Sequence, residues 1–166
     1  MDDWRVTGLY RQLVTDDPAY PANSGVWKAK LGGSGATYRL GHRISQDITV
    51  PALRVPAVTF HMKADYIGIQ HRLVVTAVTA DGTRTDLYTR HNAAGGSGGY
   101  EPVTVTFPDK FYSSSNQTVT LEFTHWDEAG NTAPFLLDDV SMQYRYKSAR
   151  LPLYDFTKYP LTSAVR

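Results

Sequence analysis

The chain has 166 residues, of which 42% are hydrophobic and 20% charged, as expected for one globular domain with its own core. Its formal net charge of +1 argues against a nucleic-acid-binding protein, which usually carries a strong basic excess. The sequence holds no cysteine, which excludes disulfides, thiolate metal sites and cysteine nucleophiles. No apolar run reaches the ~18 residues of a membrane-spanning helix, so we expect no membrane insertion.

Apolar and polar residues alternate with a period of two along most of the chain, and no helical periodicity is present. Such alternation, interrupted by Gly, Pro, Asn and Asp, predicts short strands joined by turns. In chain order, the expected strands cover residues 4–14 (with a bulge at Gly8), 26–31, 37–50 (broken near Gly41), 58–64, 73–79, 83–90, 103–107, 119–123 and 135–142. In residues 58–64, the side chains of Val58, Phe60, Met62 and Ala64 are expected to point inward. The pattern predicts an all-β fold, a single β-sandwich domain spanning residues 1–146.

The expected strand at residues 135–142 is unusual because it contains two carboxylates, Asp138 and Asp139. With a period of two, Asp138 shares a face with Leu136 and Val140, so we expect one of the two aspartates to face the core. A buried carboxylate needs a cation or several hydrogen-bond donors. Asp138 is therefore the candidate ligand of a structural calcium ion, which prefers carboxylate oxygens. The alternatives are a carboxylate that accepts backbone N–H bonds and one that a bulge exposes.

Residues 147–166 differ from the rest of the chain. Two prolines exclude a helix through this segment and favour an extended C-terminal arm. The arm carries the large apolar residues Leu151, Leu153, Tyr154, Phe156 and Tyr159. These side chains must cover some surface. The arm either packs back across its own sandwich or docks on a neighbouring subunit, as in an assembly protein.

The chain contains TYRL at residues 37–40, QDITVP at 46–51, VTFHMKA at 58–64, YEPVTV at 100–105 and VTLEF at 119–123. In their order and spacing, these segments and residues 135–142 resemble a carbohydrate-binding module of the family 4/9/22 type. The resemblance implies a galactose-binding-like β-jelly-roll and a glycan ligand. Modules of this type usually open with an extra strand near the terminal aspartates, and the two often share a structural calcium. Here that strand is missing or reduced to Met1 to Asp3.

Aromatic rings in or beside loops are candidates for stacking on sugar rings. Trp126 is the most suggestive, because the adjacent Asp127 is able to hydrogen-bond hydroxyl groups. The other candidates are Trp4, Trp27, Tyr88 and Tyr100. The alternative for each ring is a place in the core or an anchoring role in a loop.

Catalysis has little support in the sequence. The Gly-x-Ser-x-Gly match at residues 95–99 lacks the strand–turn–helix context of a hydrolase elbow. No carboxylate pair in a recognisable cleft pattern marks a glycosidase. We therefore expect a non-catalytic protein.

The combined features predict a structural protein, namely a decoration or appendage subunit of a larger assembly such as a phage particle. Its partners would be capsid or appendage subunits or further copies of itself, and glycan adhesion would be an added ability. Residues 1–5 show no signal-peptide pattern, and the arm has apolar surface to cover; both favour this hypothesis. The expected location is a virion surface or the extracellular space. The alternative is a carbohydrate-binding module of a secreted glycoside hydrolase, which explains the resemblance most simply.

Overall fold

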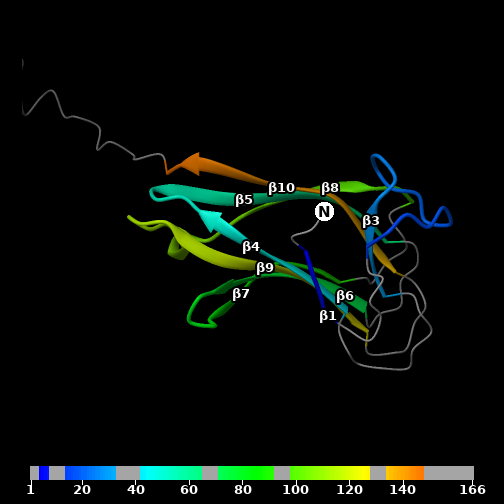
Figure 1. Cartoon of the computed structure of the whole chain (residues 1–166), viewed down its shortest axis with the longest axis horizontal. Coiled ribbons are helices and arrows are strands. Elements are labelled where there is room, and N and C mark those ends of the chain that lie inside the picture. The colour runs from blue at the N-terminus through cyan, green and yellow to red at the C-terminus, as the bar shows by residue number, and fades with distance from the viewer. Residues whose placement is uncertain are drawn as a thin grey trace, which may run out of the picture.

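The computed structural model describes residues 4–7, 14–32, 42–64, 71–91, 98–127 and 134–147. These residues form two five-stranded antiparallel sheets that are stacked face to face (Figure 1). The strands are β1 (Arg5–Thr7), β2 (Val14–Thr15), β3 (Lys28–Leu31), β4 (His42–Val50), β5 (Arg54–Ala64), β6 (His71–Thr79), β7 (Arg84–His91), β8 (Glu101–Thr106), β9 (Gln117–Asp127) and β10 (Phe135–Tyr146). A single 3-10 turn, η1 (Asp109–Phe111), follows β8.

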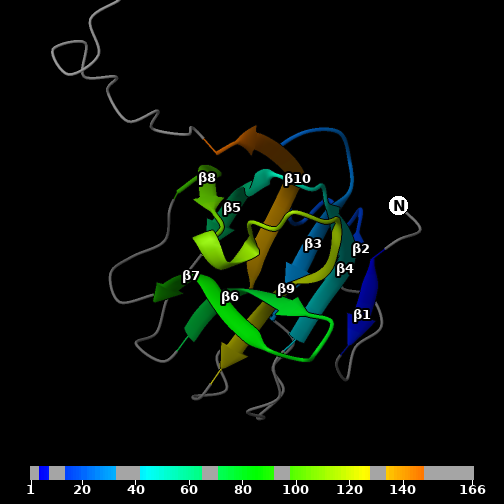
Figure 2. The same ribbon diagram turned by 90° about the vertical axis from the view of Figure 1, so that its left-hand side faces the viewer.

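Sheet A has the order β1-β4-β9-β6-β7, and sheet B has the order β2-β3-β10-β5-β8. Figure 2 shows the two layers end-on, with β10 and β5 in one and β4, β9 and β6 in the other. The predicted all-β sandwich is therefore confirmed. Within the described ranges, no helix is long and apolar enough to cross a membrane.

The core lies between the sheets and follows the predicted alternation. Val58, Phe60, Met62 and Ala64 of β5 are all buried, as expected from the sequence. The ring of Phe60 meets the ring of Phe123 from sheet A edge-on, with centroids 5.1 Å apart. Edge-to-face contacts of this kind add to the stabilisation from burial. Strand β5 thus supplies a row of four buried side chains to the core from sheet B.

The prediction of one strand over residues 4–14 is wrong. β1 pairs with β4 in sheet A, whereas β2 pairs with β3 in sheet B. The chain therefore changes sheets between Thr7 and Val14, which a continuous strand cannot do. Alternation alone did not reveal this change, because both short strands satisfy the same period.

Most other strands occur where they were expected, with shifted ends. β5, β9 and β10 are each longer than predicted, while β3 is shorter. β4 begins at His42, and residues 33–41 lie outside the described ranges. Residues 148–166 also lie outside them, including Leu151, Leu153, Tyr154, Phe156 and Tyr159. The C-terminal arm and its boundary at residue 147 remain predictions.

Candidate functional site

The two aspartates of β10 lie at a β-bulge and not in the core. Between Asp138 and Ser141 the register with β5 shifts by one residue, and Asp139 has a left-handed φ of 52°. The extra residue resets the alternation, so that Leu137 before the bulge and Val140 after it both contact the core. The expectation that one aspartate faces the core is therefore wrong. Asp138 is half-buried and Asp139 is exposed, which corresponds to the bulge alternative.

Both carboxylates hold the loop that precedes β3. Asp138 Oδ2 accepts the backbone N–H groups of Asn23 at 2.8 Å and Ser24 at 3.0 Å, and its Oδ1 accepts the backbone N–H of Asp139 at 2.8 Å. Asp139 accepts the side-chain amide of Asn23 at 2.8 Å and the hydroxyl of Ser24. We call these four residues the aspartate clamp. The bonds from Ser24 and then Asn23 hold the pKa of the Asp139 carboxyl below its usual value, and the nearby His61 contributes further.

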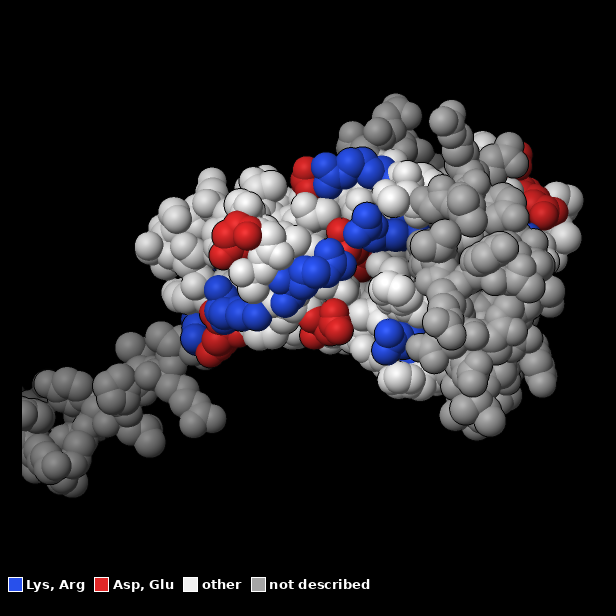
Figure 3. Space-filling view, turned by 90° about the horizontal axis from the view of Figure 1, so that it is seen from below, with Lys and Arg blue, Asp and Glu red and all other residues white. Residues whose placement is uncertain are grey.

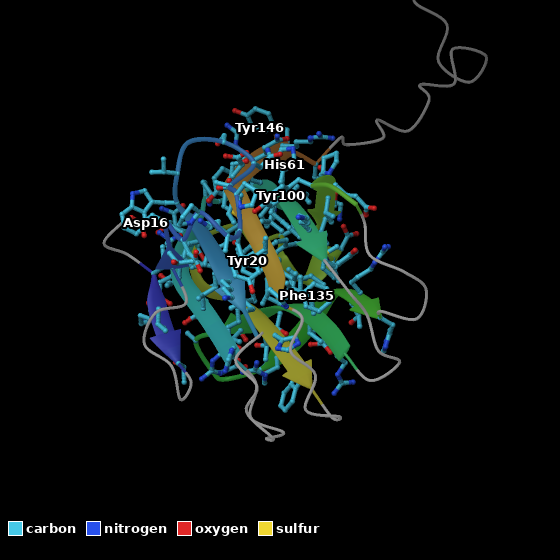
Figure 4. The ribbon with its side chains drawn as sticks, turned by 90° about the vertical axis from the view of Figure 1, so that its right-hand side faces the viewer. Asp16, Tyr20, His61, Tyr100, Phe135 and Tyr146 are labelled. Atoms are coloured by element: carbon cyan, nitrogen blue, oxygen red, sulfur yellow. The ribbon has the colours of Figure 1, made fainter. Side chains whose placement is uncertain are left out.

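The clamped loop, residues 16–27, lies against sheet B. The ammonium group of Lys30 in β3 lies 3.7 Å from the ring centroid of Tyr20 in the loop. Leu136 of β10 lies opposite Lys30 and is fully buried. It does not belong to the core cluster between the sheets, so its burial is on the outer face of sheet B. Figure 4 shows the loop beside β3 and β10, with Tyr20 labelled. The clamp therefore fixes a loop that covers part of the outer face of sheet B.

A cavity of about 410 Å³ opens beside the clamp, where the β3–β10 side of sheet B meets the β1–β4 side of sheet A. Its polar lining includes Ser24, Asp138 and Asp139 of the clamp, together with Lys28. The apolar lining includes Trp4, Val14, Val26, Trp27, Leu137 and Val140. Trp27 remains 45% exposed, so one aromatic ring is accessible. A cavity of this volume, with apolar walls and a few fixed polar groups, is typical of a site that binds a small ligand.

The second tryptophan of the cavity, Trp4, is fixed by the core. Its ring lies 6.0 Å from the ring of Phe123, centroid to centroid, at a tilt of 58°. Trp27, by contrast, lies three residues after Ser24 of the clamp and directly precedes β3. The position of Trp27 therefore depends on the clamp, whereas the position of Trp4 depends on the packing of the sandwich.

The aspartates do not provide an evident calcium site. Both oxygens of Asp138 already accept backbone N–H groups, three in all, so fewer of its lone pairs remain for a cation. Within the described part of the chain, no three His, Cys, Asp or Glu side chains are grouped as metal ligands. The Asp138 calcium site therefore remains a prediction. A higher melting midpoint with calcium than with a chelator would support it, and equal midpoints would reject it.

Of the predicted aromatic ligand residues, Trp4 and Trp27 line the cavity, and Trp126, Tyr88 and Tyr100 lie elsewhere. Trp126 is 39% exposed near the end of β9, with the guanidinium of Arg72 at 5.6 Å from its ring centroid. Asp127 is the last residue of β9, and its side chain is outside the description. Trp126 is therefore a separate exposed ring on sheet A, not part of the same cavity.

The two tyrosines among the candidates have structural contacts. The ring of Tyr88 meets Phe60 edge-on at 6.0 Å, and burial raises the pKa of its phenol. Tyr100 donates its hydroxyl to the backbone carbonyl of Pro21 at 3.1 Å, which ties β8 to the clamped loop. Both contacts correspond to the core or loop-anchor alternatives for these rings.

The outer face of sheet A carries ion pairs. Glu122, only 6% exposed, accepts hydrogen bonds from Arg43 at 3.2 Å and from Arg84. Beside it, Arg5 pairs with Asp47 at 2.5 Å, and this bond holds the pKa of Asp47 below its usual value. Figure 3 shows basic and acidic side chains alternating over the described part of this face. The charges are largely matched among themselves.

The sequence did not reveal that Asn23, Ser24 and Asp139 act together. Asn23 and Ser24 have the composition of a turn, and Asp139 differs from Asp138 only in its place in the alternation. The available signal was an Asn-Ser-Gly turn far upstream of an Asp-Asp pair in a strand. Nothing in a period-two pattern indicates that two such segments meet, because their separation in the chain exceeds 110 residues.

No protein-family model and no curated protein matches the sequence. Among solved structures, the K1 cleaved adhesin domain of Lys-gingipain from Porphyromonas gingivalis W83 has a TM-score of 0.60 and 10% identity, covering 84% of this chain and 89% of that one. TmCBM61 in complex with β-1,4-galactotriose has a TM-score of 0.56 and 13% identity, covering 86% and 88%. The chain has the jelly-roll fold of carbohydrate-binding modules.

A third neighbour supports the same fold. The CBM22-2 xylan-binding domain of Xyn10C from Paenibacillus barcinonensis has a TM-score of 0.55 and 13% identity, and the match covers 87% of this chain and 93% of that one. At such low identity the likeness concerns the fold alone. The predicted carbohydrate-module jelly roll is therefore confirmed, while the ligand must be argued from the residues of this chain.

Proposed function

We propose that this protein is a non-catalytic glycan-binding domain, and that the cavity beside the aspartate clamp holds the saccharide. The observation that carries the proposal is the exposed ring of Trp27 at a cavity of about 410 Å³. An aromatic face accommodates the apolar C–H face of a sugar ring, and nearby polar groups orient its hydroxyls. Ser24 and the clamp carboxylates provide those polar groups.

The charge of the lining favours a neutral saccharide. Asp138 and Asp139 place two carboxylates at the cavity, whereas Lys28, the one basic residue in the described part of the lining, directs its ammonium group to the carbonyl of Asp17 at 2.7 Å. A uronic acid or another anionic sugar would meet the two carboxylates, and this repulsion lowers affinity. We therefore expect neutral oligosaccharides to bind in preference to acidic ones.

Calorimetric titration tests this proposal with β-1,4-galactotriose and xylohexaose, which are neutral, and with an oligogalacturonate of similar length. We expect binding of a neutral oligosaccharide, and at least a tenfold loss of affinity in Trp27→Ala, which is about 1.4 kcal/mol. Trp126→Ala is the matched control, since it removes an exposed tryptophan that does not line the cavity. Equal loss in both variants, or unchanged affinity in Trp27→Ala, would contradict the assignment of the cavity.

The finer prediction of a decoration or appendage subunit is a second proposal. It is supported by exposed apolar residues at the end of β10, where Tyr146 is 72%, Leu53 51% and Tyr144 37% exposed. Large apolar side chains that are exposed near one another can belong to a protein interface. Light scattering of the full chain tests it: a defined oligomer that dissociates in Tyr146→Ser would support an assembly role. A monomer at all concentrations would argue for an isolated binding module.

A further inference from the structure

One edge of β10 is open over most of its C-terminal half. In sheet B, β10 lies between β3 and β5, but in the described part of the chain β3 pairs with it only over residues 135–137. Figure 1 shows β10 continuing along β5 beyond β3. The aspartate clamp and its loop lie at the next two positions, 138 and 139. Residues 141–146 therefore form an edge strand on the side that faces away from β5, and such an edge accepts a further strand.

The pairing of β5 determines which backbone groups of β10 face this open edge. Pro56 lies opposite Tyr144, and the carbonyl of Pro56 accepts the N–H of Phe107 on the β8 side at 3.0 Å. Because one residue of an antiparallel strand directs its N–H and C=O to the same side, the pair of Pro56 and Tyr144 is not hydrogen-bonded. The N–H and C=O of Tyr144 therefore point to the open edge, as do those of Met142 and Tyr146, two positions away on either side.

The side chains along the open edge are apolar on the face that continues the core. Met142 packs against the core cluster, Tyr144 is 37% exposed and Tyr146 is 72% exposed. Residues 141, 143 and 145 of the opposite face are Ser, Gln and Arg, and all three are exposed. A strand that fits this edge would place apolar side chains beside the two tyrosines.

We infer that the C-terminal arm turns back along this edge and pairs with β10 as an additional antiparallel strand of sheet B. The arm starts directly after the last residue of β10, and residues 148–166 lie outside the described ranges. A connection of four residues, 147–150, would bring Leu151 opposite Tyr146, and residues 151–155 then reach as far as Met142. The length of the arm and its starting point favour it over a separate chain, because a short connection has a small closure entropy.

The sequence of the arm suits this register. Leu151 and Leu153 would lie opposite the two tyrosines, on the apolar face of the edge. Pro152 would lie opposite Arg145, where its nitrogen faces solvent and its missing N–H removes no bond to β10. A shift by one residue would instead direct the nitrogen of Pro152 at β10 and turn both leucines to the polar face.

This inference does not depend on the cavity or on a saccharide. It differs from the assembly proposal, because it gives the exposed tyrosines of β10 a partner in the same chain. Amide hydrogen exchange of the full chain, resolved by residue, tests it without a ligand. The amides of residues 143 and 145 point to β5 and should be protected in any case, and they serve as the internal control for folding. The amides of residues 142, 144 and 146 should be protected only where a strand lies on the open edge.

Two proline variants of the arm form a matched pair. Leu153→Pro removes an N–H that the proposed register directs at β10, and we expect it to lower the protection of the amides at 142, 144 and 146 about tenfold or more. Tyr154→Pro places the proline one residue later, where the N–H faces solvent, and should leave the protection of these amides unchanged. Rapid exchange at these three positions in the unaltered protein, or an equal loss in both variants, would overturn the inference.

Light scattering at several concentrations separates this inference from the assembly proposal. We expect a monomer whose three edge amides are protected to the same degree at every concentration. Protection that appears only as the protein associates would overturn the inference and assign the open edge to a second copy. The saccharide titrations of the proposed function bear on none of these outcomes, so either proposal can fail without the other.

Discussion

Replacing Asp138 by alanine tests the structural basis of the candidate site directly. The Asp138 carboxylate accepts three backbone N–H groups, from Asn23, Ser24 and Asp139. A hydrogen bond to a charged group contributes about 1.5–3 kcal/mol to stability. Because solvent competes for the carboxylate at this half-buried position, we expect Asp138→Ala to lower the free energy of unfolding by only about 1.5 kcal/mol in total. For a domain of this size, that corresponds to a melting midpoint about 3–6 °C lower.

Differential scanning calorimetry measures this change, with Asp109→Ala as the control. Asp109 is a carboxylate whose side chain is 78% exposed and whose partner is Lys147 at 2.9 Å, so its removal should change the free energy of unfolding by less than about 0.5 kcal/mol. In Asp138→Ala we also expect faster amide exchange in residues 23–27 and weaker saccharide binding. A midpoint shift no larger than that of the control, with unchanged exchange in the loop, would refute the clamp.

Three further predictions concern the sandwich, each measured by chemical denaturation. Phe60→Ala removes a fully buried ring and should lower the free energy of unfolding by about 3–5 kcal/mol, whereas Phe60→Leu should lower it clearly less. Equal losses in the two variants would argue against tight packing around Phe60. Glu122→Gln should lower the free energy of unfolding by about 1–2 kcal/mol, which is less than the roughly 3–5 kcal/mol expected when a fully buried ion pair is broken. The reason is that the side chain of its partner Arg84 is 51% exposed and stays hydrated. Gly32→Ala should cost at least ~1 kcal/mol, because φ is +90° and an added Cβ would lie 2.6 Å from the ring of His125; a neutral effect would show that the ring can move.

The sequence was sufficient for the sandwich because a half-buried strand leaves a local signature. In β5 and β9, apolar residues at every second position mark the core face directly, and the buried side chains are those that the alternation selects. The same rule failed at residues 4–14, where two short strands of different sheets follow one another. It also failed at Asp139, where one inserted residue reverses the faces. Alternation gives no information on sheet membership or on bulges.

The candidate site was only partly predictable for a related reason. Trp27 was selected because an aromatic residue near a loop is a reasonable ligand contact, and it does line the cavity. The same criterion selected Tyr88 and Tyr100, whose contacts are with the core and with the clamped loop. A ring next to a loop has the same sequence signal whether it is exposed or anchored. Only the tertiary contacts separate the two.

The bulge in β10 connects the fold to the proposed function. Without the extra residue at Asp139, the alternation of β10 would continue unbroken and the residues after it would exchange faces. With it, Val140 returns to the core while both carboxylates remain available to Asn23 and Ser24. The loop they hold carries Trp27 to the cavity. Because an adhesin domain and a glycan-bound module both resemble this chain in fold, the fold alone does not select a ligand, and the proposed function depends on the clamp and its loop.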